Sequence, residues 1–338
     1  MLDGRTRRPQ NNNIISITYA TIMTADWNKR QLMAEFVATS TFVWAGCGAA
    51  VATNRWTEKG AIFDAGALTS ISIAFGLTIS VLAYGIGHIS GGHINPAVTL
   101  SFMVLRLQSI TAGILYMLAQ FAGATLGALI LWGCTASLTV HCDDERDSDG
   151  NLPGDINGVC SSSAKADGSG YGPPFGLGVN LVAPRVSTGS AFLLEMMGTF
   201  LLVFTVLHVA VHNKSTAGNV APIAIGWAVL VAHLVLIPFT GCGINPARSF
   251  GPMIVDTIGG LGPVVWARGC WVFYTAPFVG SAVAAFTYKF IFCEEEDAKD
   301  VIEEAAKKKN DELEKVNRPE IDDLELQPNV TGETETME

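Results

Sequence analysis

The chain has 338 residues, of which 49% are hydrophobic and only 15% charged, and its mean hydropathy is +0.35. A soluble domain usually carries about 25% charged residues, so these values exclude an ordinary soluble domain and indicate a membrane protein. The net charge of −10 comes from the C-terminal end, because residues 294–338 hold 17 acidic and 6 basic residues, a net of −11 that leaves the remainder near +1.

A helix that spans a bilayer needs roughly 20 mainly apolar residues, and six stretches meet this requirement. They are Leu32–Ala52, Leu68–Gly87, Ile110–Leu131, Ala191–Val211, Val220–Thr240 and Gly269–Tyr288. The polar segment before the first stretch has no small-residue cleavage signature, so we expect no cleaved signal peptide.

Charges between the spans predict the orientation, because short basic flanks favour the cytoplasm. The basic flanks are Arg7, Arg8, Lys29, Arg30, Arg106 and Lys214. Residues 142–188 instead hold seven acidic and three basic residues. We expect this loop to lie outside and both termini to lie in the cytoplasm.

A seven-residue phrase occurs twice, as GGHINPA at residues 91–97 and as GCGINPA at residues 241–247. In each copy Asn can cap a helix and Pro can take its first position, where no N–H is needed. A helix that begins inside hydrophobic sequence leaves irregular backbone at membrane depth, which is tolerated only beside protein or a water-filled cavity. The phrase therefore predicts a cavity.

The repeat extends beyond the phrase, because Glu35 opens the first span and Glu195 opens the fourth. Each half has three spans, an odd number, so the halves enter the membrane from opposite faces as an inverted repeat. The runs Val98–Leu105 and Ser249–Val255 allow only about ten helical residues each, or about 15 Å. Two such half-helices would meet at their N-termini and direct both positive dipole ends and both Asn amides at the centre.

The chain closely resembles the aquaporin family of major intrinsic proteins from about residue 29 to residue 292. The resemblance lies in GHISGGHINPAVT at residues 87–99 and TGCGINPARSFGP at residues 240–252, with Glu35, Glu195, Gln120 and Pro277 in matching places. It implies an all-α membrane protein with six transmembrane helices and two re-entrant half-helices in an inverted 3+3 repeat. It also implies a right-handed bundle in the lipid bilayer that assembles as a homotetramer with one pore per subunit.

The resemblance implies the following domains and site residues. Residues 1–30 form a cytoplasmic segment, residues 31–293 the channel (repeat 1 about 31–141, outer loop about 142–188, repeat 2 about 189–293), and residues 294–338 an acidic cytoplasmic tail. The pore motifs are Asn95, Pro96, Ala97, Asn245, Pro246 and Ala247. The selectivity filter is Phe75, His233, Cys242 and Arg248. The pore-lining carbonyls belong to Gly91, Gly92, His93, Gly241, Cys242 and Gly243, and Glu35 and Glu195 are expected to brace the carbonyls of the re-entrant loops.

These residues lead us to expect a passive, selective water channel of the plasma membrane, with water as its permeant. Phe75 and His233 opposite Arg248 would leave a throat about one water wide, and Ser249 resembles the water channels of the family more than the glycerol channels. Met253 departs from the small residue usual there. The alternatives are a broader facilitator that also passes hydrogen peroxide, glycerol or other small neutral solutes, and a closed-pore structural or adhesion protein.

We expect no enzyme activity, catalytic residue, cofactor, metal or nucleic-acid partner. The acidic outer loop resembles a calcium loop, but the twelfth position counted from Glu145 is Ile156 rather than a bidentate Glu, and we favour a solvated loop. Cys142 and Cys160 share this loop and could form a disulfide, with Cys134 as a competing partner. Cys242 would face the pore mouth and make permeation sensitive to mercurials.

Overall fold

The computed structural model describes residues 27–54, 65–135, 177–258, 266, 269–293, 303 and 307. Its six long helices are α2 (Lys29–Asn54), α3 (Ala65–Ser90), α5 (Ile110–Thr135), α6 (Thr188–Val206), α7 (Ala221–Thr240) and α10 (Val272–Thr287), and its two short ones are α4 (Pro96–Val104) and α8 (Pro246–Asp256). A π-helical turn continues α6 over Leu207–Val211 and α10 over Tyr288–Phe292, and a 3₁₀ turn, Gly218–Val220, precedes α7. The six spans predicted from the sequence are confirmed as helices long and apolar enough to cross a membrane.

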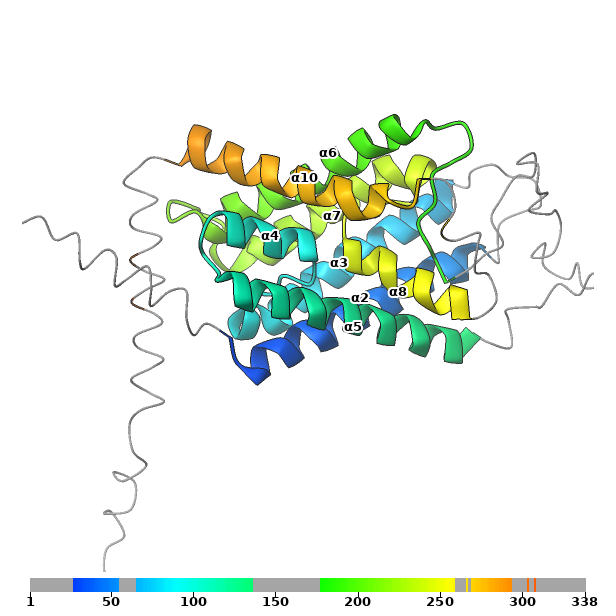
Figure 1. Ribbon diagram of the computed structural model, residues 1–338, viewed down its shortest axis with the longest axis horizontal. Helices are drawn as coiled ribbons and strands as arrows, with labels where there is room; N and C mark the ends of the chain where they lie inside the picture. Colours follow the sequence, from blue (N-terminus) through cyan, green and yellow to red (C-terminus); the bar gives the residue numbers. More distant parts are fainter. Residues whose placement is uncertain are drawn as a thin grey trace, which may run out of the picture.

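The two short helices are the re-entrant half-helices of the prediction. α4 has 9 residues and α8 has 11, and each begins at the Pro of its Asn-Pro-Ala motif. Figure 1 shows them at opposite ends of the bundle, with their N-termini toward its middle. Each spans only about half of a bilayer core, because nine to eleven residues rise roughly 14–17 Å.

The packing of the helices follows the inverted repeat. α2 packs on α5 and α3 in the first half, as α6 packs on α10 and α7 in the second. Each half-helix lies against the last helix of the other half, α4 against α10 and α8 against α5. The two halves are therefore interlocked rather than merely adjacent.

Close backbone approach joins the halves along α3 and α7. A Cβ atom on Gly226 would lie 1.9 Å from Ser80 Oγ and 2.4 Å from the Gly76 carbonyl oxygen, so only glycine fits at this crossing. Small residues at such crossings are typical of helix pairs in membranes. Large apolar side chains point outward instead, among them Val81 and Trp227, which are 67% and 64% exposed. An apolar outer surface suits contact with lipid.

α2 begins and α10 ends at the same end of the bundle, whereas α5 ends and α6 begins at the opposite end (Figure 1). Cys142, Cys160, the acidic sequence of residues 143–158 and nearly all of the tail lie outside the described residues. Among the residues that the structure does describe, no three His, Cys, Asp or Glu side chains come together as a metal site.

Candidate functional site

The two Asn-Pro-Ala motifs meet at the centre of the bundle. Asn95 Oδ1 accepts from the N–H of Ala97 at 2.8 Å, and Asn245 Oδ1 accepts from the N–H groups of Ala247 and Arg248 at 3.0 and 3.2 Å. Both asparagines therefore cap their half-helices, as the sequence predicts. Because each oxygen is held by its own helix, each amide nitrogen must point away from that helix, toward the other motif.

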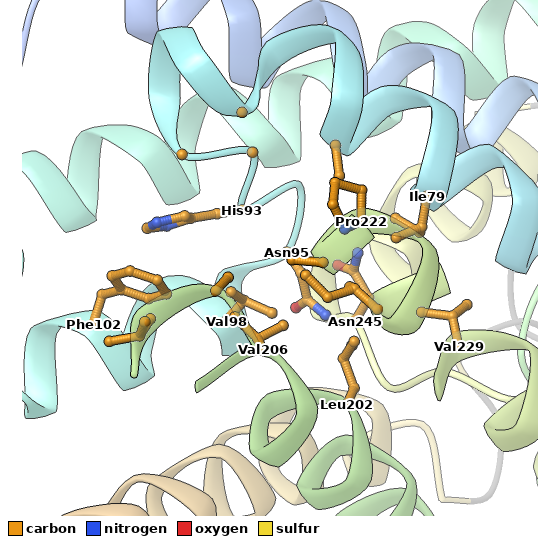
Figure 2. A pocket seen from close by; sticks show the side chains of 18 of the residues that line it. Ile79, His93, Asn95, Val98, Phe102, Leu202, Val206, Pro222, Val229 and Asn245 are labelled. Atoms are coloured by element: carbon orange, nitrogen blue, oxygen red, sulfur yellow. The ribbon is translucent and has the colours of Figure 1, made fainter. Parts of the chain in front are cut away.

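The amide nitrogens cross between the motifs. Asn95 Nδ2 donates to the carbonyl oxygen of Ile244, and Asn245 Nδ2 donates to that of Ile94, each at 2.9 Å. An amide NH₂ has two donor hydrogens, so each asparagine keeps one for another acceptor. Figure 2 shows the two side chains in the middle of a cavity of about 280 Å³.

Ile94 and Ile244 adopt the left-handed backbone region, with φ of 54° and 44°. This conformation is strained for a β-branched residue and persists only where the surroundings hold it. Here both polar groups of each residue are held. The N–H of Ile94 donates to Glu35 at 2.7 Å and that of Ile244 to Glu195 at 2.6 Å, while both carbonyls accept from the crossed asparagines. The left-handed conformation directs these two carbonyls toward the centre of the bundle, where the asparagines bind them.

The buried Glu35 accepts four hydrogen bonds. Its Oε1 accepts from Ser90 Oγ at 2.7 Å and the His93 N–H at 2.9 Å, and its Oε2 accepts from Ile94 N–H and, at 2.8 Å, from Gln120 Nε2. Gln120 also donates to Thr99 Oγ1 on α4.

Glu195 repeats this arrangement with three bonds. Its Oε1 accepts from Thr240 Oγ1 at 2.5 Å and from the Gly243 N–H at 2.8 Å, and its Oε2 accepts from Ile244. Both glutamates thus contact the re-entrant loops, as expected, but the backbone groups that they bind there are N–H groups rather than the expected carbonyls. They hold N–H groups of the re-entrant loops, including those of Ile94 and Ile244, whose carbonyls accept from the crossed asparagines.

The cavity runs from the Asn pair toward the end of the bundle where α2 begins. Gly91, Gly92 and His93 line it, whereas Gly241, Cys242 and Gly243 do not. Most of its wall is apolar; Ile79, Val98, Leu202, Val206 and Val229 are labelled in Figure 2. The His93 ring packs on Phe102 with centroids 4.3 Å apart, and its Nδ1 lies 3.1 Å from Thr99 Oγ1.

Three of the four predicted filter residues gather on the other side of the Asn pair. The rings of Phe75 and His233 stack with centroids 4.3 Å apart, and Arg248 Cζ lies 4.8 Å from the Phe75 centroid. Cys242, with a φ of 57°, is fully buried nearby and is near enough to Arg248 for an electrostatic interaction. None of these four described residues lines the 280 Å³ cavity, so the cavity ends before them.

Two buried polar atoms at this constriction have no hydrogen-bond partner, His233 Nε2 and Arg248 Nε. His233 Nδ1 lies 2.8 Å from the Val229 carbonyl, which can only accept, so Nδ1 carries the hydrogen and Nε2 is an acceptor. Arg248 Nε is a donor. The constriction therefore offers one acceptor and one donor to a small polar molecule.

The residues before α6 complete the constriction, and the sequence analysis missed them. Gly178 accepts from Arg248 Nη1 through its carbonyl at 2.8 Å. Asn180 Nδ2 donates to the Gly241 carbonyl, and Asn180 Oδ1 accepts from Ser249 Oγ, at 2.8 and 2.7 Å. These residues carry no motif, so nothing in one sequence singles them out.

A further missed residue is Asp256, which accepts from the N–H of Leu177. In the sequence, a single acidic residue after the mainly apolar run of the half-helix could have drawn attention to Asp256. Ser281 of α10 was also missed, and it donates to the Ala97 carbonyl of α4.

Comparison with known proteins agrees with this architecture. Residues 22–288 match the family model described as Major intrinsic protein. The chain is 34% identical to Aquaporin-1 of Bos taurus over 268 residues, which is 78% of this chain and 82% of the relative. It is 35% identical to Aquaporin-1 of Homo sapiens over 264 residues, 78% of this chain and 81% of the relative.

Among solved structures, it is similar to the aquaglyceroporin from Plasmodium falciparum with a TM-score of 0.61 and 20% sequence identity. The similarity covers 78% of this chain and 96% of that one. At this identity the likeness establishes the fold and leaves the permeant to the chemistry of the constriction.

Proposed function

Since the chain belongs to the major intrinsic protein family and is an integral membrane protein, we propose that it is a passive channel selective for water. The observation that carries the proposal is the constriction of Phe75, His233 and Arg248. The Phe75 ring contacts both the His233 ring and the Arg248 guanidinium at this constriction. The unpartnered His233 Nε2 supplies one acceptor, and the unpartnered Arg248 Nε supplies one donor. A single water molecule can use both.

The Asn pair supports exclusion of protons. Each asparagine has one free N–H directed at the centre, so a water there must turn its oxygen toward Asn95 and Asn245 and cannot donate to them. The N-termini of α4 and α8 also meet at this level, and their positive dipole ends oppose cations. A row of hydrogen-bonded waters would be interrupted at this point.

The wall of the cavity supports fast passage. It offers polar atoms along Gly91–His93 and at the Asn pair, while the rest is mostly apolar. A water that moves through it exchanges few hydrogen bonds at a time, because each apolar stretch offers none. Binding is then weak enough for the water to leave.

The proposal extends to the surroundings of the channel. The basic residues at the start of α2, Lys29 and Arg30, and Lys214 between α6 and α7 favour the cytoplasmic side. The channel would then lie in the plasma membrane with both termini in the cytoplasm. We further propose a homotetramer, with residues 31–293 as the channel and residues 294–338 as a cytoplasmic tail.

One observation favours a second candidate, a protein whose pore is closed at rest. The Phe75 and His233 rings are in contact, and the cavity stops before them. A structural or adhesive role would require that this contact persists.

Stopped-flow light scattering on proteoliposomes tests the candidates, with one osmotic step in sucrose and one in glycerol. A water channel shrinks the vesicles faster than empty liposomes do in sucrose and shows no rapid re-swelling in glycerol. Rapid glycerol re-entry would indicate the broader facilitator, and no acceleration over empty liposomes would indicate the closed pore. The variant His233→Gly removes the ring stacked on Phe75 and should admit glycerol; if its selectivity matches the wild type, His233 does not form the throat.

A further inference from the structure

Asp256 is a buried acid at the outer end of α8, outside the six spans. It is only 5% exposed, and both of its carboxylate oxygens accept from the backbone N–H of Leu177, at 3.1 and 2.9 Å. No salt bridge is found for it among the residues that the structure describes. An acid buried on a single N–H group is costly to keep unless it serves a purpose.

The residue after Leu177 holds the filter arginine. The Gly178 carbonyl accepts from Arg248 Nη1 at 2.8 Å, and it is joined to the Leu177 N–H through the backbone of these two consecutive residues. Gly178 has a φ of 73°, and a Cβ there would lie 3.2 Å from the backbone of Cys47. Its carbonyl therefore depends on the backbone of residues 177–178, where Asp256 holds the Leu177 N–H.

If the carbonyl moves, the guanidinium loses the one hydrogen bond that it makes among the residues that the structure describes. Arg248 Nε has no partner, and Cζ already lies 4.8 Å from the Phe75 ring. This distance is already a cation–π contact, so the bond to Gly178 fixes how the guanidinium lies against the Phe75 ring. An Arg248 released from Gly178 is free to move across the throat and obstruct it.

We propose that Asp256 is a positioning residue for the constriction: its ionised carboxylate holds residues 177–178, whose carbonyl fixes the position of Arg248 beside Phe75, and protonation of Asp256 loosens this hold. The proposal rests on the proposed function, because it assigns a role within the same throat. It makes the permeability of the channel depend on outer pH.

The ionised fraction of Asp256 changes most within the range of physiological pH. Burial raises the pKa of Asp256 to about 7, although the hydrogen bond from Leu177 lowers it. The ionised fraction then falls from about 0.9 at pH 8 to about 0.1 at pH 6. Since burial raises the pKa, the holding form is lost as the pH falls through about 7, and permeability should fall with it, by at most about ninefold.

The ionisable groups near Asp256 do not compete with it in this range. The helices packed against α8 bring Cys47 on α2, Cys134 on α5 and Tyr274 on α10 to this end of the bundle, and Arg248 lies on α8 itself. Thiols and phenols ordinarily titrate at about 8.5 and 10, and arginine stays charged. Among the described residues at this end, Asp256 is the one carboxylate.

The test is the water permeability of proteoliposomes with the same buffer on both sides, measured at several pH values between 6 and 8. We expect wild type to lose permeability with a midpoint near pH 7, and Asp256→Asn to have the low value throughout. Asp256→Glu keeps a carboxylate and should restore a pH-dependent profile. Thr257→Val is the matched control, because Thr257 bonds Trp266 and Met253 rather than residues 177–180, and its profile should follow wild type.

A wild type that is flat between pH 6 and 8, or an Asp256→Asn variant that keeps the wild-type profile, would overturn the proposal. Hydrogen exchange of the peptide around Leu177 supplies a readout that does not need transport. The Leu177 amide should exchange faster in Asp256→Asn than in wild type at pH 8, and equal rates would also overturn it. Wild-type vesicles no faster than empty liposomes at every pH would count against the water channel alone, and the exchange result would still decide the role of Asp256.

Discussion

Replacing Glu35 with Gln should destabilise the protein more than the same change at Glu195, although the two residues occupy equivalent places in the repeat. A Gln side chain has one acceptor oxygen and turns its NH₂ toward the remaining donors. If the oxygen takes the Oε1 site, Glu35→Gln keeps Ser90 and His93 but loses two donors, Ile94 and Gln120. Glu195→Gln keeps Thr240 and Gly243 and loses only Ile244.

The magnitude follows from the number of bonds lost. A hydrogen bond to a charged group contributes about 1.5–3 kcal/mol, so Glu35→Gln should cost about 3–6 kcal/mol and Glu195→Gln about 1.5–3 kcal/mol. The assay is a titration of the detergent-solubilised protein with sodium dodecyl sulfate, followed by circular dichroism, with the free energy of unfolding compared between variants.

A double-mutant comparison isolates the extra bond. In a Gln120→Ala background the fourth donor is absent, so Glu35→Gln should then cost about as much as Glu195→Gln. If Glu195→Gln proves equal to or worse than Glu35→Gln in the wild-type background, the count of bonds does not govern stability here and the reasoning is refuted.

Two further predictions concern packing and access. Gly226→Ala should destabilise the protein by about 1–3 kcal/mol, because its methyl group would clash with the backbone of α3. Gly85→Ala should be neutral or slightly stabilising, because no atom lies within 4 Å of the added carbon. Thermal unfolding in detergent measures both variants, and equal losses of stability would contradict the close crossing of α3 and α7. Mercurials should slow water permeation by reaching the buried Cys242, so permeation through Cys242→Ser should be insensitive to mercurials in the stopped-flow assay. Cys134→Ser removes an exposed thiol and should stay sensitive to them. The reverse pattern would show that the mercury site is not in the throat.

The sequence predicts the large features of this fold because they depend on local patterns. The length of apolar runs predicts all six spans, and Asn-Pro predicts both half-helices to their first residue. Helix ends are less well predicted: α3 continues to Ser90 rather than Gly87, because its last turn is held by the Glu35 carboxylate of another helix. Apolar content alone does not register such a contact.

The fine structure of the site depends on contacts between distant residues, and there the sequence is less informative. The left-handed backbone at Ile94 looks unfavourable for that residue until the bonds from Glu35 and Asn245 are seen. Asn180 and Asp256 act on residues 61 to 79 positions away, and neither belongs to a recognisable pattern. Met253, which departs from the family, is explained by packing, since its sulfur lies 3.2 Å from the hydroxyl of Tyr274.

The crossed asparagines also set an order for the synthesis of the molecule. Glu35 precedes the loop that it braces by 58 and 59 residues, so the first half-helix can be secured as soon as it leaves the ribosome. The acceptor for its Asn95 amide follows 149 residues later, and Ser281, which caps the Ala97 carbonyl, 184 residues later. The Asn95 amide and the Ala97 carbonyl of the first half must therefore stay unpaired inside the membrane, or be hydrogen-bonded to water, until the last span has been inserted. Its maturation is completed by the end of the chain rather than by its own neighbours.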